Sequence, residues 1–254
     1  MQAGKTASGI GLGIAGALAK SGANIVLNGF GLADEIDKIV SDLKRQHNVG
    51  VMYSSANIAD PDEIEDMVDK TRAEFDGVDI VVNNAGIQHV DPIEEFPVDK
   101  WNTIVALLLT SPFLLARYSW PALKSSGAGR FIAIASVHGL VASPFKAAYI
   151  SGKHGVVGLC KTLALEGADY GITANAVCPA YVRTPLVEKQ IADQARAHGL
   201  PEEEVLEKVI LQPQAVKELI EPSEVAGVVA FLASPAGKMF TGAPITLDQG
   251  WTAR

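Results

Sequence analysis

Short apolar runs alternate with amphipathic segments along this chain of 254 residues. Six of the runs are rich in Val and Ile, and most of them end in Gly, Asn or Ser. Their apolarity is continuous rather than alternating, which is typical of strands covered on both faces, as in a parallel sheet. The predicted strands span residues 23–29, 50–58, 78–86, 129–136, 172–180 and 243–250.

The segments between these runs carry helical patterns. Asp60 and Pro222 are typical helix starts, while Gly22 and Gly127 are typical helix ends. No internal repeat or linker rich in Pro and Gly divides the chain, so residues 1–254 are predicted to form one doubly wound α/β domain, a parallel sheet with helices on both faces. The predicted helices span residues 9–21, 34–47, 61–75, 97–125, 147–168 and 222–233.

Residues 185–220 interrupt the alternation of strands and helices. This segment is long, charged and helical in pattern, and it lies between the last two predicted strands. We interpret it as a helical substrate lid, with a plain surface excursion as the alternative.

Charge and cysteine content narrow the class of protein. The net charge of −8 and the pI near 5.1 disfavour nucleic acid or an anionic membrane surface as the main partner. Cys160 and Cys178 make no disulfide framework, so we expect two small buried hydrophobes in a reducing compartment. The apolar stretch at 103–116 is predicted to be a buried helix, too short and too interrupted to span a bilayer. Without a visible signal peptide, we expect a soluble, cytoplasmic protein.

Two glycine-containing stretches are suited to a nucleotide. In "SGIGLG", Gly9, Gly11 and Gly13 allow a pyrophosphate to approach the amides of a helix N-terminus, where the dipole favours negative charge. The stretch "VNNAG" at 82–86 ends a predicted strand with two amides and a glycine. Each stretch alone is weak evidence, because glycines also simply permit a tight helix start.

The stretch "AAYISGKHG" carries stronger chemistry. Tyr149 and Lys153 are spaced i, i+4 and so share one helix face. A phenol with a pKa of about 10 is a poor base at neutral pH, and a neighbouring ammonium favours the phenolate. Ser136 ends the preceding predicted strand and is suited to hydrogen-bond a substrate oxygen. An ordinary amphipathic helix with a surface lysine is the alternative, and the order of the other motifs along the chain disfavours it.

Together, "SGIG", "VNNAG", Ser136 and "YISGK" resemble the short-chain dehydrogenase/reductase family. "IVLNGFG", "NNAGIQH", "SVHGLVAS", "VRTPLVEKQI" and "GWTAR" resemble its members that oxidise 3-hydroxybutyrate, and this likeness runs the length of the chain. The resemblance implies a Rossmann-like fold and reversible hydride transfer between NAD and D-3-hydroxybutyrate, giving acetoacetate. It implies that Tyr149 takes the hydroxyl proton, that Lys153 lowers the Tyr149 pKa and holds the cofactor ribose, and that Ser136 polarises the oxygen.

The resemblance also implies a set of binding residues. A substrate carboxylate needs charge-assisted donors, and His138 and Lys146 lie close in sequence to Ser136 and Tyr149. The implied substrate-binding residues are Gln88, His138, Lys146, Tyr181, Gln190 from the lid, and Trp251. The implied cofactor-binding residues are Gly9, Ile10, Gly11, Phe30, Asn57, Ile58, Asn84, Ala85, Gly86, Tyr149, Lys153, Pro179, Val182 and Thr184. No metal site is assigned. The turn "NGFG" offers no Arg or Lys for a 2′-phosphate, which favours NAD.

Four single residues differ from those that the family has at the same positions. Leu108 stands where the family has an Asn that helps hold a water in a proton relay. Ala180 and Gln249 replace glycines, and Tyr181 replaces a Trp that faces the substrate methyl.

The start of the chain departs further. Only seven residues precede Ser8, and they form no apolar run, although a phosphate-binding turn follows directly on a buried strand. The family has its central strand here. We therefore hypothesise that about six residues are missing between Ala7 and Ser8, because a central strand is costly to lose.

Other functions stay open at this stage. The substrate can be another small alcohol or ketone, or the chain can be a catalytically impaired NAD(H)-binding member of the fold. Family members of this kind are usually homotetramers, paired partly through the helices predicted at 97–125 and 147–168.

Overall fold

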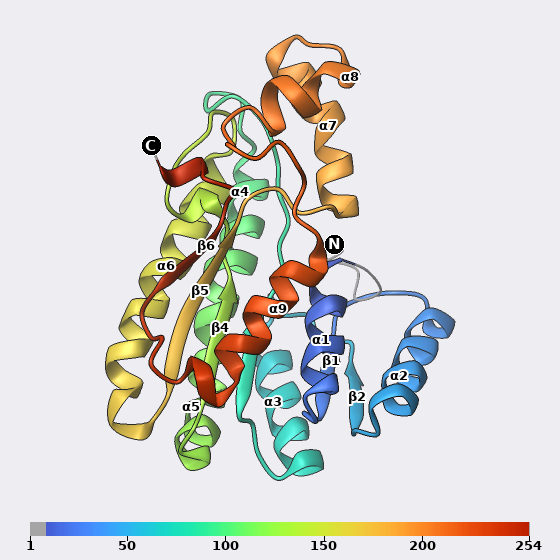
Figure 1. The fold of residues 1–254 in the computed structure, drawn as a ribbon, viewed down its shortest axis with the longest axis vertical. Coiled ribbons are helices and arrows are strands. Elements are labelled where there is room, and N and C mark those ends of the chain that lie inside the picture. The colour runs from blue at the N-terminus through green and yellow to red at the C-terminus, as the bar shows by residue number, and fades with distance from the viewer. Residues whose placement is uncertain (1–8, 254) are drawn as a thin grey trace.

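Parallel strands covered by helices on both faces form the architecture of this chain (Figure 1). The structure is a computed structural model that describes residues 9–253. All six predicted strands are present in shorter form, which confirms the α/β class. Their bounds are β1 Ile25–Asn28, β2 Val51–Ser54, β3 Ile80–Asn83, β4 Arg130–Ile134, β5 Thr173–Pro179 and β6 Pro244–Leu247.

The predicted helices are also present, and the proposed lid contains two more. The α-helices are α1 Ile10–Lys20, α2 Ala33–His47, α3 Pro61–Phe75, α4 Val98–Val105, α5 Ser111–Ser126, α6 Ala147–Gly167, α7 Pro185–His198, α8 Glu202–Val205 and α9 Pro222–Ala233. Two π-helical turns, η1 Ala106–Thr110 and η4 Leu206–Ile210, follow α4 and α8. Short 3₁₀ turns lie at Val137–Gly139, Ala168–Tyr170, Pro235–Gly237 and Trp251–Ala253.

Local chemistry sets the helix ends, as predicted. The Asp60 carboxylate accepts hydrogen bonds from the backbone amides of Asp62 and Glu63 at 3.0 and 3.4 Å and so caps α3. Pro222 is the first residue of α9. Gly127 ends α5 in the left-handed conformation, with φ of 63°.

The strands form two separate sheets. β3, β4, β5 and β6 are hydrogen-bonded in that order, whereas β1 pairs with β2, in register from Ile25 opposite Val51 to Asn28 opposite Ser54. Within residues 9–253, no strand bridges β1 and β3. The Ala7–Ser8 junction, where the missing strand was hypothesised, lies outside the described residues.

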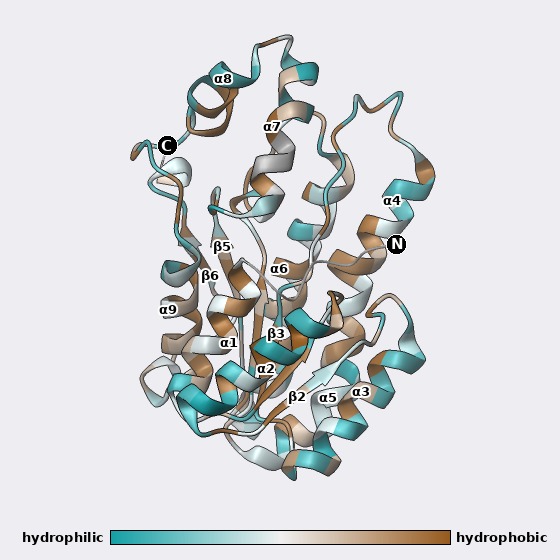
Figure 2. Ribbon diagram, turned by 90° about the vertical axis from the view of Figure 1, so that its right-hand side faces the viewer, coloured by the Kyte–Doolittle hydropathy of each residue, from teal (hydrophilic) through white to brown (hydrophobic). Residues whose placement is uncertain are grey.

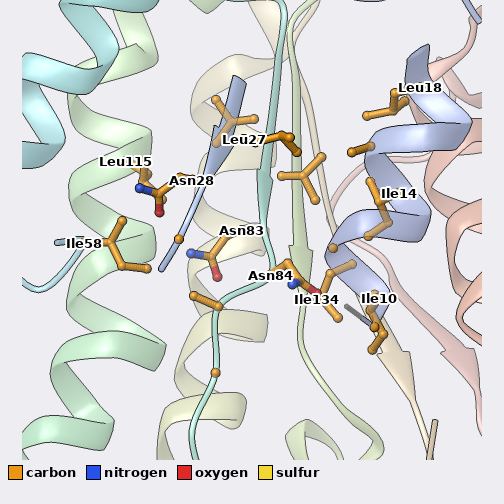
Figure 3. A pocket seen from close by; sticks show the side chains of 18 of the residues that line it. Ile10, Ile14, Leu18, Leu27, Asn28, Ile58, Asn83, Asn84, Leu115 and Ile134 are labelled. Atoms are coloured by element: carbon orange, nitrogen blue, oxygen red, sulfur yellow. The ribbon is translucent and has the colours of Figure 1, made fainter. Parts of the chain in front are cut away.

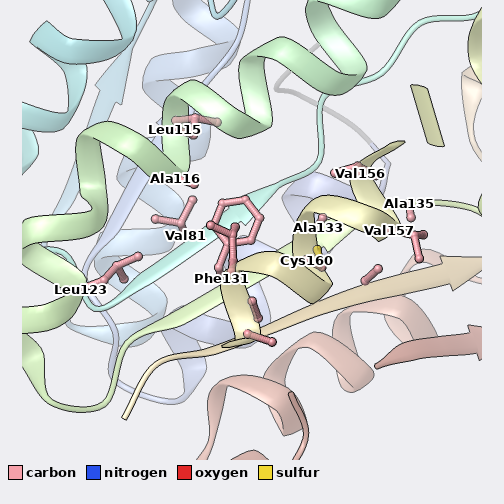
Figure 4. Packing of buried hydrophobic residues seen from close by; sticks show 14 of the residues in the cluster. Val81, Leu115, Ala116, Leu123, Phe131, Ala133, Ala135, Val156, Val157 and Cys160 are labelled. Atoms are coloured by element: carbon pink, nitrogen blue, oxygen red, sulfur yellow. The ribbon is translucent and has the colours of Figure 1, made fainter. Parts of the chain in front are cut away.

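Two apolar cores lie on opposite faces of the sheets. In one, Phe131 of β4 and Val81 of β3 pack against Leu115 of α5 and Cys160 of α6 (Figure 4). The other lies beneath α1 and α9. Cys160 and Cys178 are both buried free thiols, as predicted, and burial raises the pKa of Cys160 to about 12. The peripheral helix α2 is mostly hydrophilic (Figure 2).

One expectation about the long apolar helix is wrong. α4, η1 and α5 run on without a break as 29 residues, Val98–Ser126, long and apolar enough by composition to cross a membrane. The helix itself was predicted at 97–125, and it is the apolar stretch at 103–116 that proved part of a longer apolar run, with Pro112 and Pro121 both accommodated in it. The core explains the apolarity, since Leu107, Leu115 and Leu123 of this helix are buried.

Candidate active site

A cavity of about 1250 Å³ runs between β1 and β3 and opens as a cleft at the carboxyl ends of the strands, the edge where ligands bind in open α/β sheets (Figure 3). It brings together the three predicted catalytic residues and most of the predicted binding residues. The predicted residues that line it are Gly9, Ile10, Gly11, Ile58, Asn84, Ala85, Gly86, Gln88, Ser136, His138, Lys146, Tyr149, Lys153, Pro179, Tyr181, Val182 and Thr184.

Ser136, Tyr149 and Lys153 come from two neighbouring elements. Ser136 follows the end of β4, and its Oγ accepts a hydrogen bond from the His138 amide at 3.2 Å. Tyr149 and Lys153 lie one turn apart on α6, with the Lys153 ammonium 5.6 Å from the Tyr149 ring centroid. The Lys153 Nζ donates to the carbonyl oxygen of Ile134 at 2.6 Å, which fixes the lysine against the end of β4.

The pKa values of this group differ from the expectation. Burial raises the pKa of Tyr149, a hydrogen bond with the Ser136 side chain opposes that rise, and the net direction is upward. Burial lowers the pKa of Lys153 to about 8. The implied lowering of the Tyr149 pKa by Lys153 is therefore not found: Lys153 is directed to the Ile134 carbonyl, and desolvation outweighs the Ser136 hydrogen bond.

Lys146 is a buried cation beside this group. Its side chain is 2% exposed, and its Nζ donates to the Tyr181 hydroxyl at 3.0 Å. Burial lowers the pKa of Lys146 to about 8. In the described part of the chain, no carboxylate forms a salt bridge with it. A buried ammonium with a neutral partner favours the arrival of an anion.

Aromatic rings surround this lysine. The His138 ring lies edge-on to the rings of Tyr149, Tyr181 and Trp251, with centroid separations of 6.1, 6.3 and 5.4 Å. Trp251 stacks on Tyr181 at 6.0 Å and so packs behind the residues that line the cleft. Burial and the charge of Lys146 lower the His138 pKa to about 3, so the imidazole is neutral at physiological pH.

Two glutamines were predicted to assist Lys146. The Nε2 atom of Gln88 is buried and has no hydrogen-bond partner among residues 9–253, so it can donate to a ligand. Gln190 belongs to α7, but the placement of its side chain lies outside what the structure describes. Ser143 was not predicted as a site residue, but its Oγ lies 2.9 Å from His138 Nε2. That serine ends the stretch "SVHGLVAS", five residues after His138, so the sequence offered a signal for it.

The N-terminus of α1 fits the pyrophosphate of a dinucleotide. Gly9 has φ of 78°, which L side chains rarely adopt, and a Cβ on Gly11 would come within 2.8 Å of Asn84 Nδ2. Small residues at these two positions therefore leave the first helical amides open to an anion. Two predicted cofactor residues do not line the cleft: Phe30 packs against the core, and the Asn57 side chain accepts a hydrogen bond from Ala59.

The structure shows what surrounds three of the residues that differ from the family pattern. Leu108 lies in the π turn η1, is 1% exposed, and packs beside Tyr149. The π turn was not foreseen, and such turns are frequent at functional sites. The Ala180 amide donates to the Leu247 carbonyl at 2.9 Å. Gln249 adopts φ of 53° where the family has glycine, so the last turn is made with a non-glycine residue in the left-handed region.

A family model, curated relatives and a solved structure each match this chain over nearly its whole length. A family model described as Enoyl-(Acyl carrier protein) reductase matches residues 5–252. D-beta-hydroxybutyrate dehydrogenase of Rhizobium meliloti is 50% identical over 97% of this chain and 96% of its own length. The enzyme of the same name from Cupriavidus necator is 46% identical, with 97% and 95% covered. The structure of L-sorbose reductase from Gluconobacter frateurii, complexed with NADPH and L-sorbose, matches with a TM-score of 0.89 and 29% identity, over 98% of this chain and 94% of that chain.

Proposed function

The chain belongs to the short-chain dehydrogenase/reductase family, as its motifs predicted, and on that premise we propose that it oxidises D-3-hydroxybutyrate reversibly to acetoacetate. The observation that carries this substrate is the buried Lys146 ammonium beside Ser136 and Tyr149 in one cleft. A carboxylate two carbons away from a reacting hydroxyl suits this arrangement. The printed names of the two relatives at 50% and 46% identity support the same substrate.

The reacting hydroxyl lies with Ser136 and Tyr149. As phenolate, Tyr149 takes the substrate hydroxyl proton during oxidation, and as phenol it returns that proton during reduction. Because burial raises the Tyr149 pKa, the phenolate needs the nearby Lys153 charge to form. Ser136 donates to the same substrate oxygen and stabilises the charge that develops there. Lys153 holds the cofactor ribose. Its pKa near 8 lets the amine pass a proton onward at neutral to mildly basic pH.

The acid group of the substrate lies at the other end of the pocket. Lys146 provides a charge-assisted hydrogen bond to the carboxylate, and Gln88 provides its unpartnered amide. Neutral His138 contributes one further polar edge. Tyr181, with Trp251 stacked behind it, forms the apolar wall on which the substrate methyl packs.

The cofactor is a nicotinamide dinucleotide, and we propose that it is NAD. When bound, its nicotinamide ring supplies the hydride acceptor of the reaction. The turn that follows β1, Gly29–Gly31, carries no basic side chain for a 2′-phosphate. α2 then begins with Asp34 and Glu35, whose negative charges disfavour NADP.

One assay tests the reaction and the substrate together. The purified protein is mixed with NAD and, separately, with D-3-hydroxybutyrate, L-3-hydroxybutyrate and 2-butanol, and the NADH formed is followed by absorbance. Turnover confined to the D-acid is the expected result. Turnover of 2-butanol alone overturns the acid specificity, and NADH binding without any turnover shows a catalytically impaired member of the fold.

We also propose that the protein assembles as a homotetramer through its long helices. Trp101 on α4, Phe113 on α5 and Leu165 on α6 are large apolar side chains exposed to solvent in the single chain, which supports a helix-face contact. Light scattering after size-exclusion chromatography gives the mass directly. A monomeric mass at micromolar concentration contradicts the proposal.

A further inference from the structure

Phe145 has a backbone conformation that is unusual for its residue type. Its φ is 66°, in the left-handed region that a side chain with a Cβ rarely adopts. Asn48 and Asp76 share this conformation, but each of them ends a helix, where it is common. Phe145 ends no helix and stands directly before Lys146. Backbone strain away from a helix end persists where the surroundings hold it, and such strain gathers at functional sites.

The left-handed turn at Phe145 leads the chain into Lys146. Lys146 is the N-cap residue of α6, and its carbonyl oxygen accepts a hydrogen bond from the Ile150 amide at 3.0 Å. Its side chain lines the cleft, where Nζ donates to the Tyr181 hydroxyl at 3.0 Å. A change of φ at Phe145 rotates the chain that enters Lys146, so the direction of this side chain depends on the conformation of its neighbour.

The carbonyl group of Phe145 holds a second segment of the site. It accepts a hydrogen bond from the Asp91 amide at 3.0 Å. The Asp91 carboxylate pairs with His89 Nε2, and the His89 ring lies edge-on to Phe96 with centroids 5.3 Å apart. These contacts fix the loop that follows Gln88, the residue whose buried amide nitrogen has no partner in the described part of the chain.

The ring of Phe145 contacts a third segment, the proposed lid helix α7. It lies edge-on to the His198 ring, with centroids 5.7 Å apart and an interplanar angle of 80°. Such a geometry gives a directional attraction between ring edge and ring face. Positions 190, 194 and 198 follow one another at four-residue spacing and so share a face of α7. Gln194 on that face is only 2% exposed, so the face is covered by the body of the protein.

Phe145 itself does not line the cleft. It is half-buried behind the cleft, where it meets three segments that are far apart in the sequence. Each of these segments carries a residue that was predicted to bind the substrate carboxylate, namely Gln88, Lys146 and Gln190. A residue that joins all three without reaching the cleft acts on the substrate through them.

We propose that Phe145 is a positioning residue for the acid-binding end of the pocket. Its left-handed backbone directs Lys146 into the cleft, its carbonyl group fixes the loop after Gln88, and its ring holds the last turn of α7. The proposal rests on the proposed function, because it concerns binding of an acid substrate.

Two substitutions at this position separate the ring from the backbone. Phe145→Asn removes the ring but tolerates the left-handed conformation, whereas Phe145→Val removes the ring and disfavours that conformation. We expect Phe145→Asn to raise KM for D-3-hydroxybutyrate roughly three- to tenfold, with little change in kcat or in KM for NAD. A larger rise is expected for Phe145→Val. An unchanged KM for the acid in Phe145→Asn, or an equal rise in KM for NAD, overturns the proposal.

Substitutions on α7 test the same contact from its other side. His198→Ala is expected to raise KM for the acid as much as Phe145→Asn, and the double variant no further, because both remove one ring contact. His198→Phe keeps a ring and is expected to retain the unsubstituted KM. Arg196→Ala, at an exposed residue of the same turn, is the matched control. Additive effects in the double variant contradict a shared contact.

Hydrogen exchange decides the inference without any substrate. In the protein alone, Phe145→Asn and His198→Ala are expected to speed exchange of the α7 amides, Pro185–His198, at least roughly threefold, and to leave α6 unchanged. Mass spectrometry of the exchanged, digested protein measures both helices. If the unsubstituted protein does not turn over D-3-hydroxybutyrate, the proposed function fails, while faster exchange of α7 still supports the contact. Equal exchange of α7 in all three proteins overturns the inference.

Discussion

The two sheets of this molecule differ in completeness. The sheet β3–β6 has four paired strands, and its central strands β4 and β5 are buried along their whole length. The sheet β1–β2 has two strands and touches the remainder mainly through α1, which packs on α9. Ser136 follows β4, and Tyr149 and Lys153 lie on α6, which packs against β5. The end of the cleft suited to the adenosine half of a dinucleotide belongs to the two-stranded sheet.

The catalytic residues and the adenosine end of the cofactor site therefore lie on different sheets. The catalytic residues are held by hydrogen bonds within the complete sheet, such as that from Lys153 to Ile134 at 2.6 Å. A two-stranded sheet is marginal by itself, so the adenosine end depends on the packing of α1 and α2 against β1 and β2. Substitutions of the catalytic residues are therefore expected to leave cofactor affinity unchanged, and substitutions in the two-stranded sheet to leave the catalytic residues in place.

The largest expected effect concerns the complete sheet. Tyr149→Phe removes the group that takes the hydroxyl proton but keeps the ring that packs beside Leu108. We expect kcat/KM to fall by about 10³-fold or more, while the NADH dissociation constant changes little. Steady-state kinetics and NADH fluorescence titration measure the two quantities. Tyr170→Phe, at an exposed tyrosine, is the matched control. A variant that retains activity contradicts the catalytic assignment of Tyr149.

Sequence patterns predicted most of the complete sheet and its chemistry. Runs of Val and Ile, the Asp60 cap and the Gly127 stop are local signals, and they located elements to within a few residues. The i, i+4 spacing placed Tyr149 and Lys153 on one face of α6. The contact between Lys146 and Tyr181 joins residues 35 apart in the chain, so no local pattern contains it. The raised pKa of Tyr149 depends on desolvation by the assembled core, which is equally invisible in sequence.

Hydrogen exchange compares the two sheets directly. The amides of β1 have one paired edge, whereas those of β4 are paired on both sides. We expect the amides of Ile25–Asn28 to exchange at least roughly a hundredfold faster than those of Phe131–Ile134, because the smaller sheet opens locally. Mass spectrometry of exchanged, digested protein measures both. Equal protection of the two segments would mean that both sheets unfold as one cooperative unit, which contradicts local opening of the two-stranded sheet.

A smaller effect is expected at the acid-binding end of the pocket. Lys146→Gln replaces a charge-assisted hydrogen bond with a neutral one, so KM for D-3-hydroxybutyrate is expected to rise roughly 30-fold with a smaller change in kcat. Lys161→Gln, at an exposed lysine of α6, the helix that Lys146 immediately precedes, is the control. Substrate-saturation curves measure the change. An unchanged KM favours a neutral substrate.

The pH dependence of KM follows from the same residue. The Lys146 pKa is near 8, so the ammonium that binds the carboxylate is present below pH 8 and is lost above it. KM is expected to be flat below pH 8 and to rise toward about tenfold per pH unit above it. In Lys146→Arg the guanidinium stays charged, so KM is expected to stay flat through pH 9. The kcat profile serves as an internal control, since it reports on Tyr149 and Lys153 instead.

The smallest expected effect concerns Leu108, which packs against the helix that carries both Tyr149 and Lys153. A Cβ on Gly152 would come within 2.8 Å of the Leu108 Cβ, so the two elements touch there. Leucine neither donates nor accepts a proton, whereas the Asn that the family has at this position does both through water. Leu108→Asn is expected to raise kcat by about three- to tenfold, toward the gain of an assisted proton path.

The same change buries an amide, so a lower melting temperature is expected beside the faster rate. Leu107→Asn, one residue earlier and also buried, separates the two consequences, because that side chain faces the core beneath α5 and α6. It is expected to lower the melting temperature without a gain in kcat. If both variants only lose stability, the proton leaves Lys153 by a route that does not pass Leu108, and the departure at this position has no cost in rate.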